Sequence, residues 1–76
     1  MSKVKVYTSS TCRYCKAVKA FFDENNVEYE EKNIDRDREA LNELIEKGHR
    51  GVPVIDIDGE EIVGFDKERL QKALHL

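Results

Sequence analysis

The chain has 76 residues, of which 39% are hydrophobic and 38% charged, and this composition predicts one soluble globular domain with a single modest core. Its 13 basic and 16 acidic residues are interspersed, so the net charge is −3 and no basic stripe of the kind that binds nucleic acid is present. No run approaches the ~18 apolar residues of a membrane helix. We therefore expect a monomeric protein with neither nucleic acid nor membrane as a partner.

The first predicted element is a strand over residues 3–7, where side chains alternate with a period of two. The chain moves into this strand with no export signal before it, so a cytoplasmic location is expected. Lys3 and Lys5 interrupt a strand that should be apolar throughout if it lies in the centre of a covered sheet. We expect Lys5 to lay its stem on the sheet and to carry its ammonium group outward.

A helix is predicted from Arg13 to about Asn25, and both cysteines of the chain, Cys12 and Cys15, lie at its start. The first turn of a helix exposes unpaired N–H groups and the positive end of the macrodipole, which stabilise a thiolate. We therefore expect the Cys12 thiolate to form below the ~8.5 at which a free thiol titrates. Positions three apart share a helix face, so the two sulfurs can form a disulfide. The apolar stripe of this helix contains Tyr14, Ala17, Val18, Phe21 and Phe22.

Three interpretations of the Cys-x-x-Cys pair are open, and a redox dithiol is favoured because such a pair beside a β-α-β pattern is typical of redox proteins. A structural zinc site normally needs four Cys or His ligands. Only His49 and His75 remain for that purpose, and they fall in different predicted elements. The third interpretation is a pair of inert cysteines in the core.

The second half of the chain predicts two more helices and a hairpin. A strand from Val27 to about Asn33 completes a β-α-β unit, whose strands must be parallel and whose crossover is right-handed. Asp35 or Asp37 caps a second helix, which ends at Gly48. Residues 52–57 and 60–63 form a hairpin around Asp58-Gly59, and Asp66 caps a last helix. The apolar stripes of the two helices are Ala40, Leu41, Leu44 and Ile45, and Leu70, Ala73 and Leu74.

The predicted order is therefore β-α-β-α-β-β-α, an α/β domain over residues 1–76. Three motifs in it together resemble the glutaredoxin family of the thioredoxin fold: Cys12-Arg13-Tyr14-Cys15, Val52-Pro53 and Gly64-Phe65-Asp66. The resemblance covers the whole chain and implies a thioredoxin-like, four-stranded mixed sheet flanked by three helices, with the three motifs on one surface. It implies a thiol-disulfide oxidoreductase that requires no metal or organic cofactor and has glutathione as a candidate co-substrate.

The resemblance also implies roles for individual residues. Cys12 attacks disulfides, Cys15 resolves the mixed disulfide, and Pro53 is cis and faces the sulfurs, although an isolated X-Pro bond is normally trans. A cis Pro53 would leave the Val52 backbone free to pair with an extended peptide or glutathione. Arg50, which is otherwise a solvated loop charge, lies near the carboxylate of a bound thiol.

Two further residues have a structural and a functional interpretation. Tyr14 either packs in the core or lies beside the dithiol, and similarity to the family's Cys-Pro-Tyr-Cys motif favours the second place. Asp66 is a helix cap first, and the amino group of glutathione is its second partner. His49 has no counterpart in the family, and we expect it to be exposed.

Three departures from the family pattern leave the reductant open. Arg13 replaces a common proline and adds a cation close to Cys12. Ser9 stands where many glutaredoxins have a basic residue that contacts glutathione. Gly64-Phe65 replaces the family's Gly-Gly turn. In this respect the chain is similar to the glutaredoxin-like electron donors of ribonucleotide reductase, which thioredoxin reductase reduces. The expected partners are thus disulfide-containing proteins, with glutathione or a thioredoxin-reductase-like flavoprotein as reductant.

The sequence leaves two other classes of function open. Some glutaredoxins bridge an iron–sulfur cluster, but they usually have Gly-Phe-Ser after the first cysteine, and Arg13-Tyr14-Cys15 does not match. A redox-silent interaction domain is the other alternative.

Overall fold

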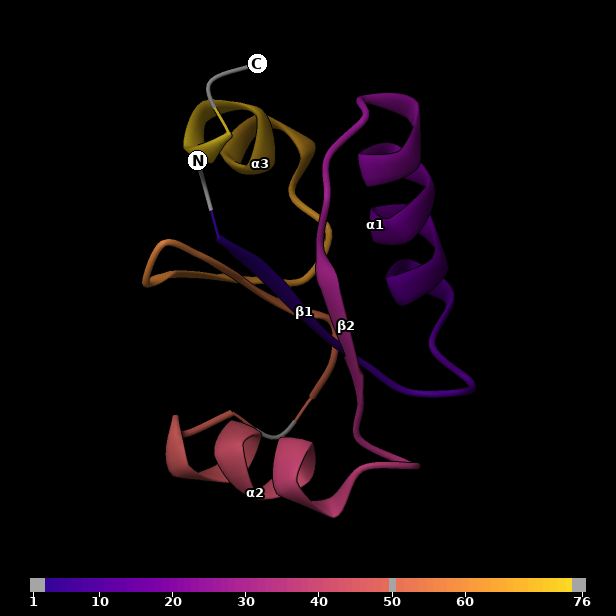
Figure 1. Cartoon of the computed structure of the whole chain (residues 1–76), viewed down its shortest axis with the longest axis vertical. Coiled ribbons are helices and arrows are strands. Elements are labelled where there is room, and N and C mark those ends of the chain that lie inside the picture. The colour runs from indigo at the N-terminus through magenta and orange to yellow at the C-terminus, as the bar shows by residue number, and fades with distance from the viewer. Residues whose placement is uncertain (1–2, 50, 75–76) are drawn as a thin grey trace.

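A mixed four-stranded sheet forms the centre of the fold, with the strand order β2-β1-β3-β4 (Figure 1). The computed structural model describes residues 3–49 and 51–74. The elements confirm the predicted order, and in chain order they are β1 Val4–Thr8, α1 Arg13–Glu24, β2 Glu30–Asn33, α2 Arg38–Glu46, β3 Val54–Ile57, β4 Glu60–Val63 and α3 Lys67–Ala73. No helix among the described residues has the length and apolar character needed to cross a membrane.

Strand β1 lies between β2, to which it is parallel, and β3, to which it is antiparallel. Its residues are buried except Lys5, which is half-buried, so β1 is a central strand despite the lysine. Tyr7 is the register partner of Val54. The C-terminal end of β1 and the start of β3 therefore lie side by side, at the edge from which the chain passes to Cys12.

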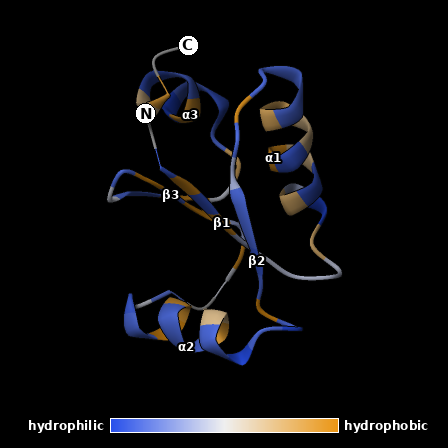
Figure 2. Cartoon of the chain, in the orientation of Figure 1, coloured by the Kyte–Doolittle hydropathy of each residue, from blue (hydrophilic) through white to orange (hydrophobic). Residues whose placement is uncertain are grey.

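The helices cover the two faces of the sheet, with α1 and α3 on one face and α2 on the other (Figure 1). Figure 2 shows the apolar residues along β1 and β3 and on the helix sides nearest the sheet. The core on the α1 and α3 face contains Val4, Val6, Val18, Phe21, Phe22, Ile55, Ile57, Ile62 and Leu70. The smaller core under α2 contains Tyr7, Ala40, Leu44 and Val54.

The end of α1 explains why β2 begins at Glu30 and not at Val27 as predicted. Asn26 adopts the left-handed conformation with φ +56°, and the Val27 N–H donates to the Phe22 carbonyl at 2.8 Å. This is the arrangement by which a helix end satisfies its last carbonyls. Because the Val27 N–H is used there, pairing with β1 starts only where Glu30 faces Lys5.

The predicted helix caps and the hairpin turn are confirmed. Asp37, the second of the two predicted candidates, caps α2 by accepting from the N–H groups of Glu39 and Ala40. Gly48 follows α2 with φ +86°, and Asp58 and Gly59 both have positive φ, as a two-residue hairpin of this type requires. The side chains of Leu44 and Leu70 are buried as predicted.

The apolar stripes of α1 and α2 were predicted too wide. Tyr14 is 67% exposed and Ile45 is 58% exposed, so neither belongs to the core. Each lies at the margin of its stripe, where a rotation of ~100° per residue carries a side chain away from the sheet. Burial at such positions depends on where the neighbouring elements end, and periodicity does not contain that information.

Candidate active site

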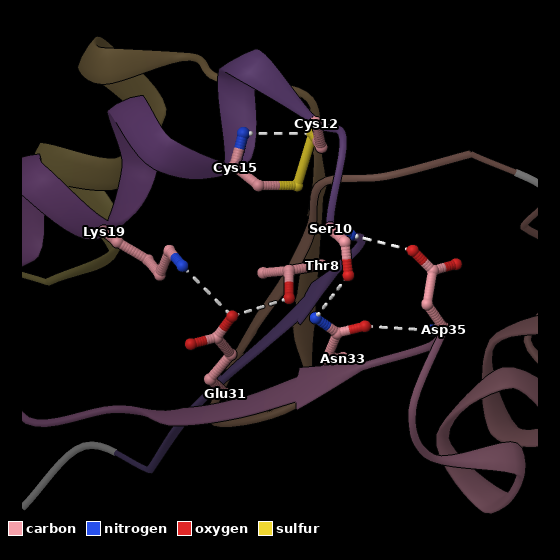
Figure 3. The surroundings of a disulfide bond; sticks show 8 residues. All are labelled: Thr8, Ser10, Cys12, Cys15, Lys19, Glu31, Asn33 and Asp35. Carbon is pink, nitrogen blue, oxygen red and sulfur yellow. Dashed lines mark hydrogen bonds and ion pairs between the residues drawn. A yellow bond between two sulfur atoms is a disulfide. The ribbon is translucent and has the colours of Figure 1, made fainter.

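The two cysteines form a disulfide at the start of α1, with their Cα atoms 5.3 Å apart (Figure 3). Cys12 is the N-cap residue in an extended conformation, and the Cys15 N–H donates to the Cys12 Sγ at 3.1 Å. Cys12 is half-buried, whereas Cys15 is only 1% exposed. The pair is thus asymmetric, because an incoming molecule can reach Cys12 more easily than Cys15.

The helix start favours a charged sulfur at Cys12 when the disulfide is reduced. The N–H of Cys15 is one of the donors that an α-helix leaves unpaired in its first turn, and it already points at the Cys12 sulfur. The positive end of the helix macrodipole adds to that field. A thiolate attacks disulfides and a thiol does not, so the helix start favours the reactive form of a sulfur at this position.

A polar network joins the three elements around the dithiol and lies below the disulfide in the view of Figure 3. The hydroxyl of Thr8, which is fully buried at the end of β1, donates to Glu31 Oε2 at 2.8 Å. Lys19 Nζ lies 3.1 Å from the same oxygen. The Thr8 hydrogen bond, with help from Lys19 and against the effect of burial, holds the pKa of Glu31 below its ordinary value. The network connects β1, α1 and β2 within one turn of Cys15.

A second set of contacts holds the loop between β1 and Cys12 against the turn after β2 (Figure 3). The Ser10 N–H donates to Asp35 Oδ2 at 2.8 Å, and the Ile34 N–H donates to the Thr8 carbonyl at 2.8 Å. Asn33 Oδ1 accepts from the Asp35 N–H at 2.9 Å. Asp35, the other predicted cap of α2, therefore holds the dithiol loop in place.

The Val52–Pro53 peptide bond is cis, as predicted. Pro53 is buried, and its carbonyl accepts from the Gly64 N–H at 2.9 Å, so the proline and the glycine turn meet. Gly64 has φ +80°, a conformation that favours glycine. Because Val54 pairs with Tyr7, the Val52–Pro53 segment enters the sheet at the edge to which β1 delivers the dithiol.

The other predicted site residues divide into two groups. Arg13 and Tyr14 are exposed on the first turn of α1, between the two cysteines, so the core interpretation of Tyr14 is wrong. Phe65 is half-buried, with its ring 6.2 Å from that of Phe21 in an edge-on arrangement. Asp66 caps α3 by accepting from the Arg69 N–H at 3.2 Å. Arg50 lies outside the described residues.

His49 was predicted to be exposed, and this prediction is wrong. Its Nε2 lies 2.9 Å from Glu61 Oε1, and its side chain is only 22% exposed. This pair connects the segment after α2 with β4.

Sequence analysis also missed Thr8, Lys19 and Glu31. Their one available signal is positional: Thr8 ends a strand directly before the dithiol loop, where a buried hydroxyl needs a partner.

Comparison with known proteins agrees with this fold and site. The chain matches the glutaredoxin family profile over residues 4–62. The glutaredoxin-like protein NrdH of Lactococcus lactis subsp. lactis is 38% identical over 69 residues, covering 91% of this chain and 96% of the relative. The crystal structure of the thioredoxin-like protein BC3987 superposes with a TM-score of 0.88 at 40% identity, covering 93% of this chain and 99% of the other.

A further solved structure, described as the structural basis for the thioredoxin-like activity profile of the glutaredoxin-like protein NrdH-redoxin from Escherichia coli, has a TM-score of 0.85 at 27% identity and covers 92% of each chain. A thioredoxin-like sheet with a Cys-x-x-Cys pair at the start of α1 defines a dithiol redox protein. Within that class, the chain belongs to the glutaredoxin family. It is a thiol-disulfide oxidoreductase.

Proposed function

We propose that the protein reduces disulfides in other proteins and mixed disulfides with glutathione, with Cys12 as the attacking sulfur. The observation that carries this assignment is the asymmetry of the pair: Cys12 is accessible and accepts the Cys15 N–H, while Cys15 is buried. In such an arrangement the accessible cysteine attacks the substrate disulfide, and the buried cysteine resolves the mixed disulfide that results. The cycle needs no metal and no organic cofactor.

The reaction proceeds by two exchanges. The Cys12 thiolate forms a bond to one sulfur of the substrate disulfide, the substrate S–S bond breaks, and the departing thiolate takes up a proton from water. Cys15, once deprotonated, attacks the Cys12 sulfur, so the second substrate thiol leaves and the Cys12–Cys15 disulfide forms. The two electrons lost by the dithiol are returned by an external thiol or reductase.

The surface around Cys12 supports binding of an extended substrate. Tyr14 offers an exposed ring, and among the described residues no hydrogen bond uses the backbone of Val52. We propose that Val52, which precedes the cis Pro53, pairs with the substrate backbone. Asp66 uses Oδ1 as a helix cap, which leaves Oδ2 for an amino group. Gly64 and Arg13 border this surface in the proposal, and Arg50 is assigned to a substrate carboxylate.

A thioredoxin-reductase-like flavoprotein is the second candidate for the reductant. Ser9 offers no cation to glutathione. Phe65 packs against Phe21, at a position where the resemblance to glutaredoxins implies a second glycine. The similarity to NrdH proteins, one of which is described by a thioredoxin-like activity profile, favours the same alternative. A cycling dithiol of this kind suits a reducing compartment, so we propose a cytoplasmic location. We also propose that the protein acts as a monomer.

The Cys15→Ser variant distinguishes the two reductants. With oxidised glutathione, the first candidate predicts a stable glutathione adduct on Cys12, seen by mass spectrometry, and turnover of the wild type by reduced glutathione. The second candidate predicts little adduct and reduction of the wild-type disulfide by NADPH with thioredoxin reductase. Cys12→Ser is the control and should form no adduct. Failure of both systems to reduce the wild type would contradict both candidates.

A further inference from the structure

Helix α1 carries its charges in the order that opposes its own macrodipole. Its first turn contains Arg13 and no acidic residue, and its last turn contains Asp23 and Glu24 and no basic residue. The first turns of α2 and α3 differ from that of α1 because they contain Glu39 and Glu68. Cations lie beside these acids there, Arg38 in α2, and Lys67 and Arg69 in α3. Acidic side chains stabilise the N-terminal end of a helix and basic ones destabilise it. Departures from such local rules concentrate at functional sites.

The cations of this turn, Arg13 and Lys16, have no structural partner that accounts for them. Lys19, Lys32 and Lys47 each lie 3.0–3.1 Å from a carboxylate oxygen. Among the described residues, no carboxylate lies within ion-pair distance of Arg13 or Lys16. Both side chains are exposed, so their charge is available to a molecule that approaches the helix.

The position of these two cations decides which molecule meets them. They flank Tyr14, which is 67% exposed, and they stand on the same first turn as the two cysteines. Any chain segment that brings its disulfide to the Cys12 sulfur must lie against this turn. The whole protein has a net charge of −3, so the chain apart from these two cations carries −5 and repels an acidic partner.

We propose that Arg13, Tyr14 and Lys16 form a docking surface that selects protein disulfides flanked by acidic residues. This inference rests on the proposed attack by Cys12 and adds the charge of the preferred partner. Complementary charges beside a reactive group raise the rate of productive encounter and exclude partners of the wrong sign. Stabilisation of the Cys12 thiolate by the same cations would speed all substrates equally, so it cannot produce a preference between them.

The test compares three substrates for the fully reduced protein: a peptide disulfide flanked by glutamates, the same peptide with lysines, and the neutral bis(2-hydroxyethyl) disulfide. At low ionic strength the wild type should have a kcat/KM about tenfold higher for the glutamate peptide than for the lysine peptide, since exposed pairs contribute about two- to fivefold each. Raising the salt concentration to about 0.5 M should bring this ratio close to one, because exposed charges are then screened.

The double variant Arg13→Gln, Lys16→Gln should lose the preference at low salt, whereas the matched control Lys72→Gln, on the last turn of α3, should keep it. A preference unchanged in the double variant would overturn the docking surface. So would an equal loss of kcat/KM for all three substrates, since that would assign the cations to the Cys12 thiolate and not to the choice of partner. A wild type that reduces none of the substrates would instead contradict the proposed function itself.

The melting temperature of the same double variant gives an independent readout. Because the two cations oppose the macrodipole, their removal should leave the melting temperature unchanged or raise it by a few degrees. A clear fall would show that Arg13 and Lys16 stabilise the fold, and would overturn the functional explanation of their charges.

Discussion

Replacing Cys12 with serine is expected to lower kcat/KM for disulfide reduction by at least about 10³-fold, because the hydroxyl cannot replace the more accessible of the two cysteine sulfurs as nucleophile. The variant should keep the wild-type fold, since Ser is itself a preferred N-cap residue and can accept the Cys15 N–H. The rate is measured with the prereduced protein and a peptide disulfide. Stability is checked by thermal unfolding against the reduced wild type.

The matched variant Cys15→Ser should fail at a different step. Its Cys12 thiolate can still attack, so a covalent adduct with the peptide should accumulate and resist release without an added thiol. Mass spectrometry after digestion locates the adduct. An adduct on Cys15 in the Cys12→Ser protein at the wild-type rate would contradict the assignment of the attacking sulfur.

The second large effect concerns the packing of α1 on the sheet. Phe22→Ala is expected to lower the free energy of unfolding by about 3–5 kcal/mol, the usual cost of truncating a buried phenylalanine. Phe22 is fully buried, and its ring centroid lies 5.2 Å from that of Tyr29 and 6.0 Å from that of Phe21. A domain of this length has a total stability of roughly 4–11 kcal/mol, so the variant should be close to unfolding.

The control for Phe22→Ala is Tyr14→Ala, which removes a similar ring from the same helix where it is 67% exposed. Urea unfolding should show a change within about 0.5 kcal/mol for this variant. Its effect should fall on KM for peptide disulfides, because Tyr14 borders Cys12. Equal loss of stability in the two variants would contradict the observed packing of α1.

Local signals made most of the fold predictable. The Asp58-Gly59 turn, the caps at Asp37 and Asp66, and the helix ends each depend on the conformational preferences of one or two residues. The dithiol was predictable for the same reason, because its position is set by two adjacent elements, the strand before Cys12 and the helix that begins after it. The start of β2 was not, because the Val27 N–H has two competing uses and only the end of α1 decides between them.

Contacts between distant segments account for the rest. Thr8 and Glu31 are 23 residues apart, and His49 and Glu61 are 12 apart, so no local pattern indicates that they meet. Their pairing depends on the register of β1 with β2 and on the path of the chain from α2 to β3 and β4. Whether Tyr14 is buried also depends on where the edge of the sheet lies relative to α1. The periodicity of α1 does not contain this information.

The measurement that tests the central claim most directly is a redox titration of the Cys12–Cys15 pair in the wild-type protein. The protein is equilibrated in glutathione buffers of defined potential, and the fraction of free thiols is measured by alkylation and mass spectrometry. The account predicts a two-electron transition with a midpoint between about −180 and −270 mV, the range of dithiols that exchange electrons with other proteins. A midpoint below about −300 mV, typical of structural disulfides, or a pair that never oxidises, would contradict it.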